Sequence, residues 1–272
     1  MKKALTLSIV IPVYNEEAHL RACLDSIARQ TQLPDEVIVV DNNSQDKTVD
    51  IANSYPFVRI VSEPVQGKVF ARNRGFDTAK SDLIGRIDAD SRLNSDWVAT
   101  TKTYFEANPG VAAVTGNCYF YDFPFRRSFR VLHHFVYYQM QKLIAGSEIL
   151  WGSNMAVTNT AWQSVRAECL SRPDTKMHED IDLSLHLQNN GYVIKRSPGL
   201  VVEVSLRRGD FGPVSIISYL WPWPMTYWAN KRYLQAVLVC AVLFVVWLLV
   251  LPISLVVLAA SRLRNFLKNF FA

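Results

Sequence analysis

The chain contains few cysteines, and none of them stand close together. Four are scattered over 272 residues without a C-x-x-C motif, and the last lies in a long apolar run: Cys23, Cys118, Cys169 and Cys240. This pattern argues against a zinc site and favours a reducing compartment, because zinc sites and disulfide frameworks usually show closely spaced cysteines.

Charged residues are absent from residues 236–260, which contain a single proline, Pro252. As a helix, this apolar stretch is long enough to cross about 30 Å of hydrocarbon. We therefore predict one transmembrane helix here, preceded by an aromatic and basic interfacial segment over 211–235 and followed by a basic amphipathic tail over 261–272. A bent, re-entrant helix at Pro252 is the alternative.

The N-terminus lacks the features of a cleavable signal peptide. Lys2 and Lys3 precede an apolar run, but this run is short, is interrupted at Pro12 and has no small-residue cleavage site. We predict a strand there instead.

The net charge of +5 comes partly from basic residues on both sides of 236–260. Such clusters suit anionic lipid headgroups better than nucleic acid. We therefore expect a membrane as a partner and no nucleic acid.

Strand-like and helix-like segments alternate through the N-terminal third of the chain. Continuous apolar runs predict strands at 5–13, 36–40, 57–61 and 82–88. The helix after the first strand is expected to be capped by Asn15 and to bury Leu20, Leu24 and Ile27. This order and its short connections predict a Rossmann-like α/β fold, with a mostly parallel open sheet and helices on both faces. Ligands of such sheets bind at the carboxyl ends of the strands.

Two carboxylates, Asp88 and Asp90, lie at the end of the fourth predicted strand. In an extended strand, residues i and i+2 point to the same side, so both side chains can reach one cation where the strand ends. Mg²⁺ and Mn²⁺ prefer oxygen ligands, and Mg²⁺ is often held by carboxylates together with phosphates of the substrate. The alternative is a pair of carboxylates that only supports a turn.

Six motifs then occur in one order along the chain: VIPVYNEE, VVDNNSQDKT, GKVFARNRG, DAD, GSNMA and HEDID. Together they resemble the inverting nucleotide-sugar glycosyltransferases of family 2, which have the GT-A fold. The resemblance covers residues 7–208, about three quarters of the chain. It implies a catalytic domain over residues 1–210.

The resemblance also implies a donor site. Four residues would line the nucleotide pocket: Pro12, Tyr14, Glu16 and Asp41. Asp41 would hold the ring N–H of the base, and Arg72 and Asn73 would lie near the diphosphate or the donor sugar. Asp88 and Asp90 would coordinate the Mn²⁺ or Mg²⁺ ion that bridges the diphosphate.

The catalytic base implied by the resemblance is Asp180, in the HED sequence. Inverting transfer needs one carboxylate that takes the proton of the acceptor hydroxyl. Adjacent residues on a helix are about 100° apart, so Glu179 and Asp180 cannot both face the acceptor. Which of the two is the base stays open, and the acidic cluster has the alternative role of favouring the helix N-terminus.

Departures from the family pattern refine the expected activity. Residues 42 and 43 are asparagines where the family usually has Asp and Gly, a change that mainly alters the turn. The Q-x-x-R-W motif of processive synthases is absent, which favours transfer of a single sugar. The expected reaction moves a sugar from a nucleotide-diphosphate sugar to a lipid-linked or polyprenyl-phosphate acceptor in cell-surface glycan synthesis. The expected location is the inner (plasma) membrane, with a single span and a cytoplasmic catalytic domain.

Two other functions compete with this one. A sugar-phosphate nucleotidyltransferase needs a glycine-rich loop after its first strand, and IVIPVYNEE contains no glycine. A non-catalytic, membrane-anchored scaffold would be expected to lose Asp88, Asp90 or Asp180, and all three are present.

Overall fold

The structure is a computed structural model that describes residues 4–122, 138–170, 177–205, 221–245 and 247–248. The chain forms two compact units, which are described separately below. The first comprises Met1–Thr175 and Glu179–Ser205, and the second comprises Lys176–His178 and Leu206–Ala272.

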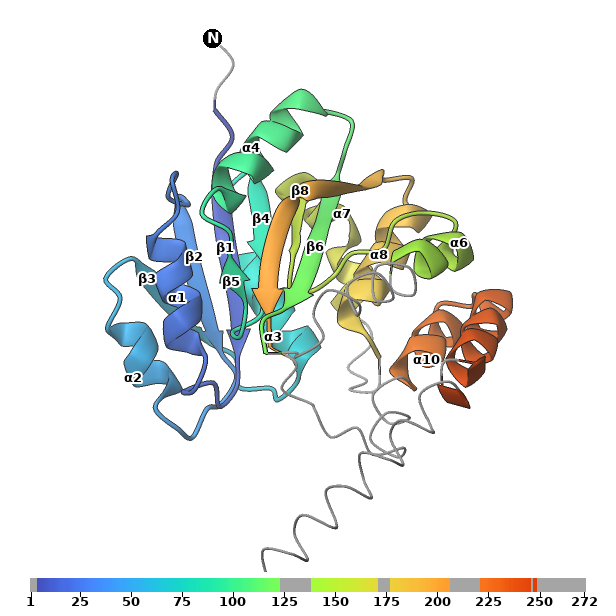
Figure 1. The fold of residues 1–272 in the computed structure, drawn as a ribbon, viewed down its shortest axis with the longest axis horizontal. Helices are drawn as coiled ribbons and strands as arrows, with labels where there is room; N and C mark the ends of the chain where they lie inside the picture. Colours follow the sequence, from blue (N-terminus) through green and yellow to red (C-terminus); the bar gives the residue numbers. More distant parts are fainter. Residues whose placement is uncertain (1–3, 123–137, 171–176, 206–220, 246, 249–272) are drawn as a thin grey trace, which may run out of the picture. The chain divides into compact units, whose positions relative to one another are not determined.

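The first unit contains the sheet and the helices that cover it (Figure 1). Its strands are β1 (Leu7–Val13), β2 (Glu36–Asp41), β3 (Val58–Ser62), β4 (Leu83–Arg86), β5 (Arg92–Leu93), β6 (Ala113–Phe120), β7 (Met155–Thr158) and β8 (Ile194–Val204). Its helices are α1 (Leu20–Ala28), α2 (Thr48–Asn53), α3 (Lys68–Thr78), α4 (Trp97–Ala107), α6 (Gln141–Ala145), α7 (Asn159–Leu170) and α8 (Glu179–Asn189).

The eight strands form one sheet in the order β3-β2-β1-β4-β7-β6-β8-β5. β3, β2, β1 and β4 run parallel, which confirms the parallel sheet expected for the N-terminal part of the chain. Beyond β4 the sheet is mixed, because β7 runs antiparallel to both β4 and β6, while β6 and β8 are parallel. The fold is therefore an α/β fold with a mixed sheet.

Helices cover both faces of this sheet, and the side chains of β1 show why. Leu7, Ile9, Ile11 and Val13 pack in one core with α1 and α4, whereas Val10 packs in a second core with α3, α7 and α8. Successive side chains of a strand point to opposite faces, so a strand covered on both sides must be apolar throughout. This explains the continuous apolar run in the sequence.

The predicted start of the first helix was wrong. Asn15 has a left-handed backbone (φ 53°), and its side-chain oxygen accepts a hydrogen bond from the backbone N–H of Gln45. An N-cap residue usually has an extended backbone and bonds to its own helix. α1 therefore begins only at Leu20, although its buried face includes Leu20, Leu24 and Ile27 as predicted.

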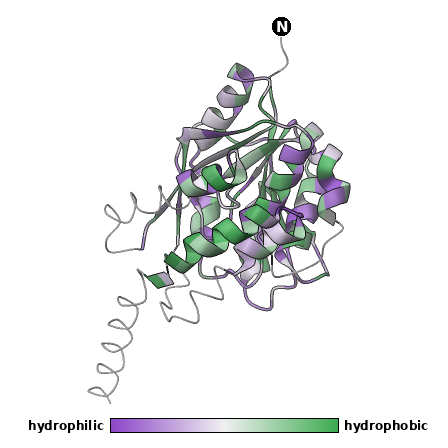
Figure 2. Cartoon of the chain, turned by 90° about the vertical axis from the view of Figure 1, so that its right-hand side faces the viewer, coloured by the Kyte–Doolittle hydropathy of each residue, from purple (hydrophilic) through white to green (hydrophobic). Residues whose placement is uncertain are grey.

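The described residues of the second unit are mostly helical. α10 (Pro222–Ala229) begins at a proline, and the Thr226 hydroxyl accepts a hydrogen bond from the backbone N–H of His178 at 2.9 Å. Residues 233–245 are also helical, and Figure 2 shows them mostly in the green of hydrophobic side chains.

A membrane span is not found among the helices of the described residues, none of which combines the necessary length and apolarity. The predicted span over 236–260 is described only up to residue 248, without residue 246. Residues 249–260, the predicted tail over 261–272 and the first ten residues of the predicted interfacial segment lie outside the described residues.

Candidate active site

Parallel pairing brings the carboxyl ends of β1, β2 and β4 to one edge of the sheet. Val13 at the end of β1 lies opposite Asp41 at the end of β2, and β4 pairs with β1 in the same direction. The residues that follow these strands, among them Tyr14 and Asp88, therefore lie along the edge where open α/β sheets bind ligands.

The four residues expected around a nucleotide are accessible at this edge. Tyr14 is 49% exposed, and Pro12, Glu16 and Asp41 are half-buried. Asp41 Oδ1 accepts a hydrogen bond from the backbone N–H of Ser44 at 3.1 Å. No described residue donates to Asp41 Oδ2, so this oxygen can accept a hydrogen bond from a ligand.

The two asparagines that depart from the family pattern shape the neighbouring loop. The amide nitrogen of Asn42 donates to the carbonyl oxygens of Glu63 and Val65, which an aspartate in its place could not do. Asn43 has a φ of 69°, a left-handed conformation that glycine and asparagine tolerate best. The turn therefore keeps its backbone shape and gains two hydrogen bonds to the loop before α3.

Arg72 and Asn73 lie in the interior of the protein. Arg72 is 0% exposed and Asn73 is 2% exposed. Arg72 Nε donates to Asn73 Oδ1, and its Nη1 donates to the backbone oxygen of Glu179 at 2.8 Å. In this arrangement the pair holds the start of α8, and its predicted contact with a donor stays a prediction.

Arg86, at the end of β4, connects two acidic residues of the site. Its Nη2 lies 2.8 Å from Glu179 Oε1 and 3.1 Å from Asp88 Oδ1. Burial by itself lowers the pKa of Arg86, but the charges of Glu179, Asp88 and Asp180 raise it above its ordinary value. The guanidinium therefore stays charged and joins the β4 edge to the N-terminus of α8.

Asp88 and Asp90 do not lie on a continuous strand, contrary to the prediction. β4 ends at Arg86, and the two carboxylates lie in a turn. In this turn the backbone N–H of Ser91 donates to the backbone oxygen of Asp88. Asp90 is 8% exposed, whereas the side chain of Asp88 is 40% exposed. The Ser91 hydroxyl donates to the backbone oxygen of Ser153, in the loop before β7.

This pair has the chemistry of a site for a hard cation. Desolvation raises the pKa of Asp88, and the nearby charges of Asp90 and Glu179 add to this effect, against the opposing charges of Arg86 and Lys68. No described residue donates to Asp88 Oδ2. Carboxylate oxygens at the edge of the sheet fit Mg²⁺ or Mn²⁺, whose charge would offset the repulsion between the two side chains.

The three acidic residues at the start of α8 point to three different partners. Glu179 is 7% exposed and pairs with Arg86, whereas Asp182 is 5% exposed and lies 3.5 Å from the ring of His186. Asp180 is half-buried, and its Oδ2 accepts a hydrogen bond from the backbone N–H of Gly152 at 2.9 Å. Of the three, Asp180 is therefore the one that is neither buried nor paired with a cation.

Gly152 is needed where the loop before β7 passes Arg86. A Cβ atom at residue 152 would lie 2.4 Å from Arg86 Nη1, and the guanidinium cannot easily move because two carboxylates hold it. The roles of Arg86 and Gly152 were not predicted from the sequence. The available signal was a charged residue, Arg86, inside an otherwise apolar strand.

The chain matches the profile of one protein family over more than half of its length. The profile of "Glycosyl transferase family 2" matches residues 8–163, more than half of the chain. Among curated relatives, an uncharacterized glycosyltransferase, YibD, of Escherichia coli is 33% identical over 107 residues, which are 38% of this chain and 31% of YibD. The glycosyltransferase AglE of Haloferax volcanii is 31% identical over 121 residues, which are 42% of this chain and 40% of AglE. The matches thus span well under half of these relatives.

Solved structures show the same fold. A mannosyltransferase from Pyrobaculum calidifontis, in complex with GDP-Man and Mn²⁺, matches with a TM-score of 0.67 and 22% identity over 96% of this chain and 76% of that one. TarS from S. aureus, in complex with UDP-GlcNAc, matches with a TM-score of 0.59 and 16% identity over 78% of this chain and 67% of that one. These likenesses show the fold, and the profile match confirms the family resemblance of the motifs: this chain belongs to glycosyl transferase family 2.

Proposed function

We propose that the protein is an inverting hexosyltransferase that moves one sugar from a nucleoside-diphosphate sugar to a lipid-linked acceptor at a membrane. The observation that carries this proposal is the pairing of Arg86 with both Asp88 and Glu179. It joins the carboxylates that follow β4 to the helix that carries Asp180. A group for the leaving diphosphate and a base for the acceptor are thereby held at one edge of the sheet.

The donor would bind along the ends of β1 and β2. Asp41 Oδ2 would accept the ring N–H of the base, and the half-exposed ring of Tyr14 offers a flat surface beside it. Two structures of the same fold hold a GDP sugar and a UDP sugar. These complexes support a nucleotide-sugar donor and are compatible with the nucleobase of either GDP or UDP.

A divalent cation, Mn²⁺ or Mg²⁺, would be held by Asp88 and Asp90. When bound, such a cation neutralises the charge that develops on a diphosphate leaving group. The Mn²⁺ in the mannosyltransferase structure supports this assignment. Arg86 keeps Asp88 in place through its Oδ1, which leaves Oδ2 to face the ligand.

Asp180 would act as the general base. It takes the proton of the acceptor hydroxyl while the hydroxyl oxygen forms a bond to the anomeric carbon and the bond to the diphosphate breaks on the opposite side. The hydrogen bond from the Gly152 N–H orients the carboxylate of Asp180. Glu179 cannot easily take this role, because its side chain is buried against Arg86.

The second unit would bring the active site to a membrane. Its described residues include large apolar side chains that are each at least 43% exposed: Trp221, Trp228, Tyr233, Leu234, Val237, Leu238, Phe244, Val245 and Leu248. Exposed apolar patches of this kind mark interaction or membrane surfaces. We propose that they continue into the apolar run over 236–260, anchor the chain in the plasma membrane and keep the catalytic domain in the cytoplasm with the nucleotide sugars.

A donor screen tests this function. Purified protein is incubated with single nucleotide sugars, with membranes as the acceptor, and the released nucleoside diphosphate is measured with Mn²⁺, with EDTA, and with EDTA followed by excess Mn²⁺. We expect release from one class of donor, its loss in EDTA and its recovery with Mn²⁺. Release from no donor would contradict the proposal and favour a scaffold role, whereas equal release by the Asp180→Asn variant would contradict the assignment of Asp180 as the base.

A further inference from the structure

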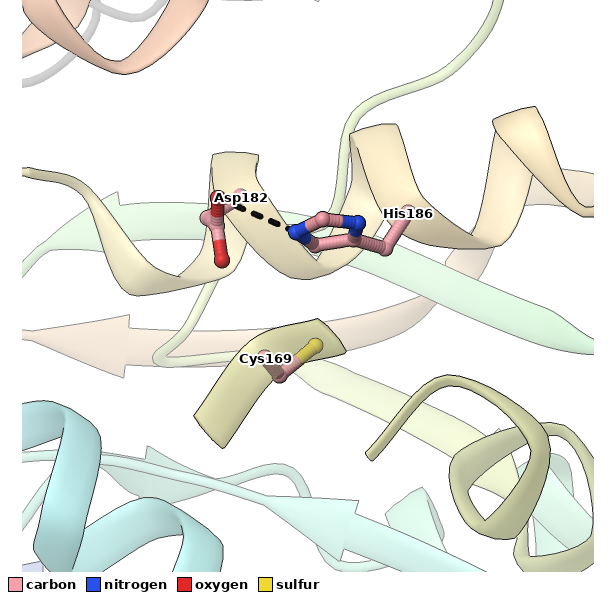
Figure 3. Close-up of side chains that lie close together, drawn as sticks. All are labelled: Cys169, Asp182 and His186. Carbon is pink, nitrogen blue, oxygen red and sulfur yellow. Dashed lines mark ion pairs between the residues drawn. The ribbon is translucent and has the colours of Figure 1, made fainter. Parts of the chain in front are cut away.

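A second cluster of metal-ligating side chains lies between α7 and α8, apart from Asp88 and Asp90. Cys169 lies near the end of α7, and Asp182 and His186 lie one turn apart on α8 (Figure 3). One ligand atom from each residue lies within 4.8 Å of the other two. The three residues are 1%, 5% and 7% exposed, so the cluster is shielded from water.

The ring of His186 is oriented as in a metal-ligating histidine. Its Nδ1 lies 2.8 Å from Glu168 Oε2. Its Nε2 points into the cluster, 3.5 Å from Asp182 Oδ1, and forms no hydrogen bond within the described part of the chain. Histidine ligands usually donate one ring N–H to a carboxylate and present the other nitrogen to the metal. A buried ring nitrogen without a hydrogen bond otherwise costs free energy.

The spacing and the ligand types suit a cation of the zinc class. Zinc ligands lie about 2.0–2.3 Å from the metal, which puts neighbouring ligand atoms of a tetrahedral site roughly 3.3–3.8 Å apart. The distance of 3.5 Å between His186 and Asp182 falls in this range. A thiolate and an imidazole together favour Zn²⁺ over Mg²⁺ or Ca²⁺, which prefer oxygen ligands.

The surrounding charges balance such a cation. Burial raises the pKa of the Cys169 thiol to about 12, and the charge of nearby Arg72 opposes this rise. A bound metal deprotonates a coordinating thiol. The charges of a divalent cation and of Arg72 would then balance those of the Cys169 thiolate, Asp182 and Glu168, with His186 neutral.

We propose that Cys169, Asp182 and His186 bind one divalent transition-metal cation of the zinc class, which clamps α7 to α8. The cluster escapes sequence analysis because its members are not closely spaced cysteines and meet only when the two helices pack. The clamp would hold the helix whose first turn carries Glu179 and Asp180. It is separate from the cation of the proposed reaction, which has only carboxylate ligands in the protein.

Cobalt substitution tests this inference without measuring catalysis. The full-length protein is treated with a chelator, dialysed and titrated with Co²⁺, whose bond to a thiolate gives a charge-transfer band in the near ultraviolet. We expect this band to appear and to saturate at one Co²⁺ per chain in the wild type. Zn²⁺ should displace the bound Co²⁺ and abolish the band, and Mg²⁺ should do neither.

Matched variants identify the ligands. The band should be lost in Cys169→Ala and strongly weakened in His186→Gln, and it should persist in Cys118→Ala, which removes another buried thiol. A wild-type protein that shows no band, or a Cys169→Ala variant that keeps it, would overturn the proposal. If the wild type shows no band, His186 is only an ion-pair partner of Asp182 and Glu168. Because the wild-type titration decides by itself, the proposal can be refuted even if a variant fails to fold. Carboxylates alone give no thiolate band, so this result is independent of the proposed transferase activity.

Discussion

Arg86 Nη2 and Glu179 Oε1 lie 2.8 Å apart, although 93 positions separate the two residues in the sequence. Both side chains are almost fully buried, at 5% and 9% exposed. The pair joins the central strand β4 to the first turn of α8. The position of Asp180, the next residue on that helix, therefore depends on an ion pair inside the protein.

Breaking this pair should destabilise the first unit strongly. Arg86→Met leaves the Glu179 carboxylate buried without its partner, and we expect a loss of about 3–5 kcal/mol in the free energy of unfolding, measured with urea. The double variant Arg86→Met/Glu179→Met should recover part of this loss, because it leaves no unpaired charge. As a control, Arg59→Met breaks a half-exposed pair with Glu36 and should cost no more than about 1 kcal/mol. Equal losses for the two single variants would contradict a buried, essential pair.

The pocket at the end of β2 gives a second prediction. Asp41→Ala should weaken nucleotide binding by about 1.5–3 kcal/mol, the range for a hydrogen bond to a charged group. Calorimetry with free UDP and GDP measures the loss and shows which base is bound. Asp50→Ala, which removes an exposed carboxylate on α2, is the control. If Asp41→Ala binds both nucleotides as the wild type does, Asp41 only supports the turn to Ser44.

Asp35, which contacts the N-terminal strand β1, makes the stability of the fold depend on pH. Its Oδ2 accepts hydrogen bonds from the backbone N–H of Leu7 at 2.8 Å and from Lys102 Nζ at 2.7 Å. Desolvation acts to raise the pKa of Asp35, but these bonds more than offset it and lower the pKa below its ordinary value. The ionised carboxylate therefore stabilises the fold above the unfolded-state pKa of about 4, and this contribution is lost as the pH falls through the lower folded-state value.

Asp35→Asn tests this sign. Urea unfolding should show the variant less stable than the wild type near pH 7, with a difference that shrinks as the pH falls below about 4. Lys102→Met should reduce the same pH dependence, because it removes one of the two donors. A difference that stays constant down to about pH 2, or grows there, would rule out this role for Asp35.

The parallel half of the sheet and its ligand edge could be predicted from the sequence, because each strand is one apolar run with a short connection. β8 could not, because Pro198 and Gly199 in its centre resemble a turn. The strand tolerates them through an irregularity in its pairing with β6, between Thr115 and Asn117.

The site was predictable only where its residues follow strands or match motifs. Asp41, Asp88 and Asp180 are of this kind. The sequence could not show that Glu179 pairs with Arg86 while Asp180 contacts Gly152, because both contacts depend on how α8 packs against β4 and the loop before β7. The burial of Arg72 likewise results from packing, against Phe76 and Trp162.

The C-terminal part of the chain should serve the acceptor rather than the donor. Deleting residues 233–272 should leave nucleotide binding unchanged and strongly reduce transfer to a membrane acceptor. Undiminished transfer by the truncated protein would contradict the membrane role. A reporter fused after Ala272 tests the topology separately: a cytosolic signal would exclude a single span and favour a re-entrant helix at Pro252.

The most direct test of the account compares Asp180→Asn with Glu179→Gln in the release of nucleoside diphosphate from the donor identified by the screen. Asp180→Asn keeps the size of the side chain but removes its basicity, so kcat should fall by about 10²–10⁴ while nucleotide affinity stays near that of the wild type. Glu179→Gln, which weakens the pair with Arg86, should reduce kcat less among correctly folded molecules. The reverse order of the two effects, or a wild-type kcat for Asp180→Asn, would contradict the assignment of Asp180 as the base.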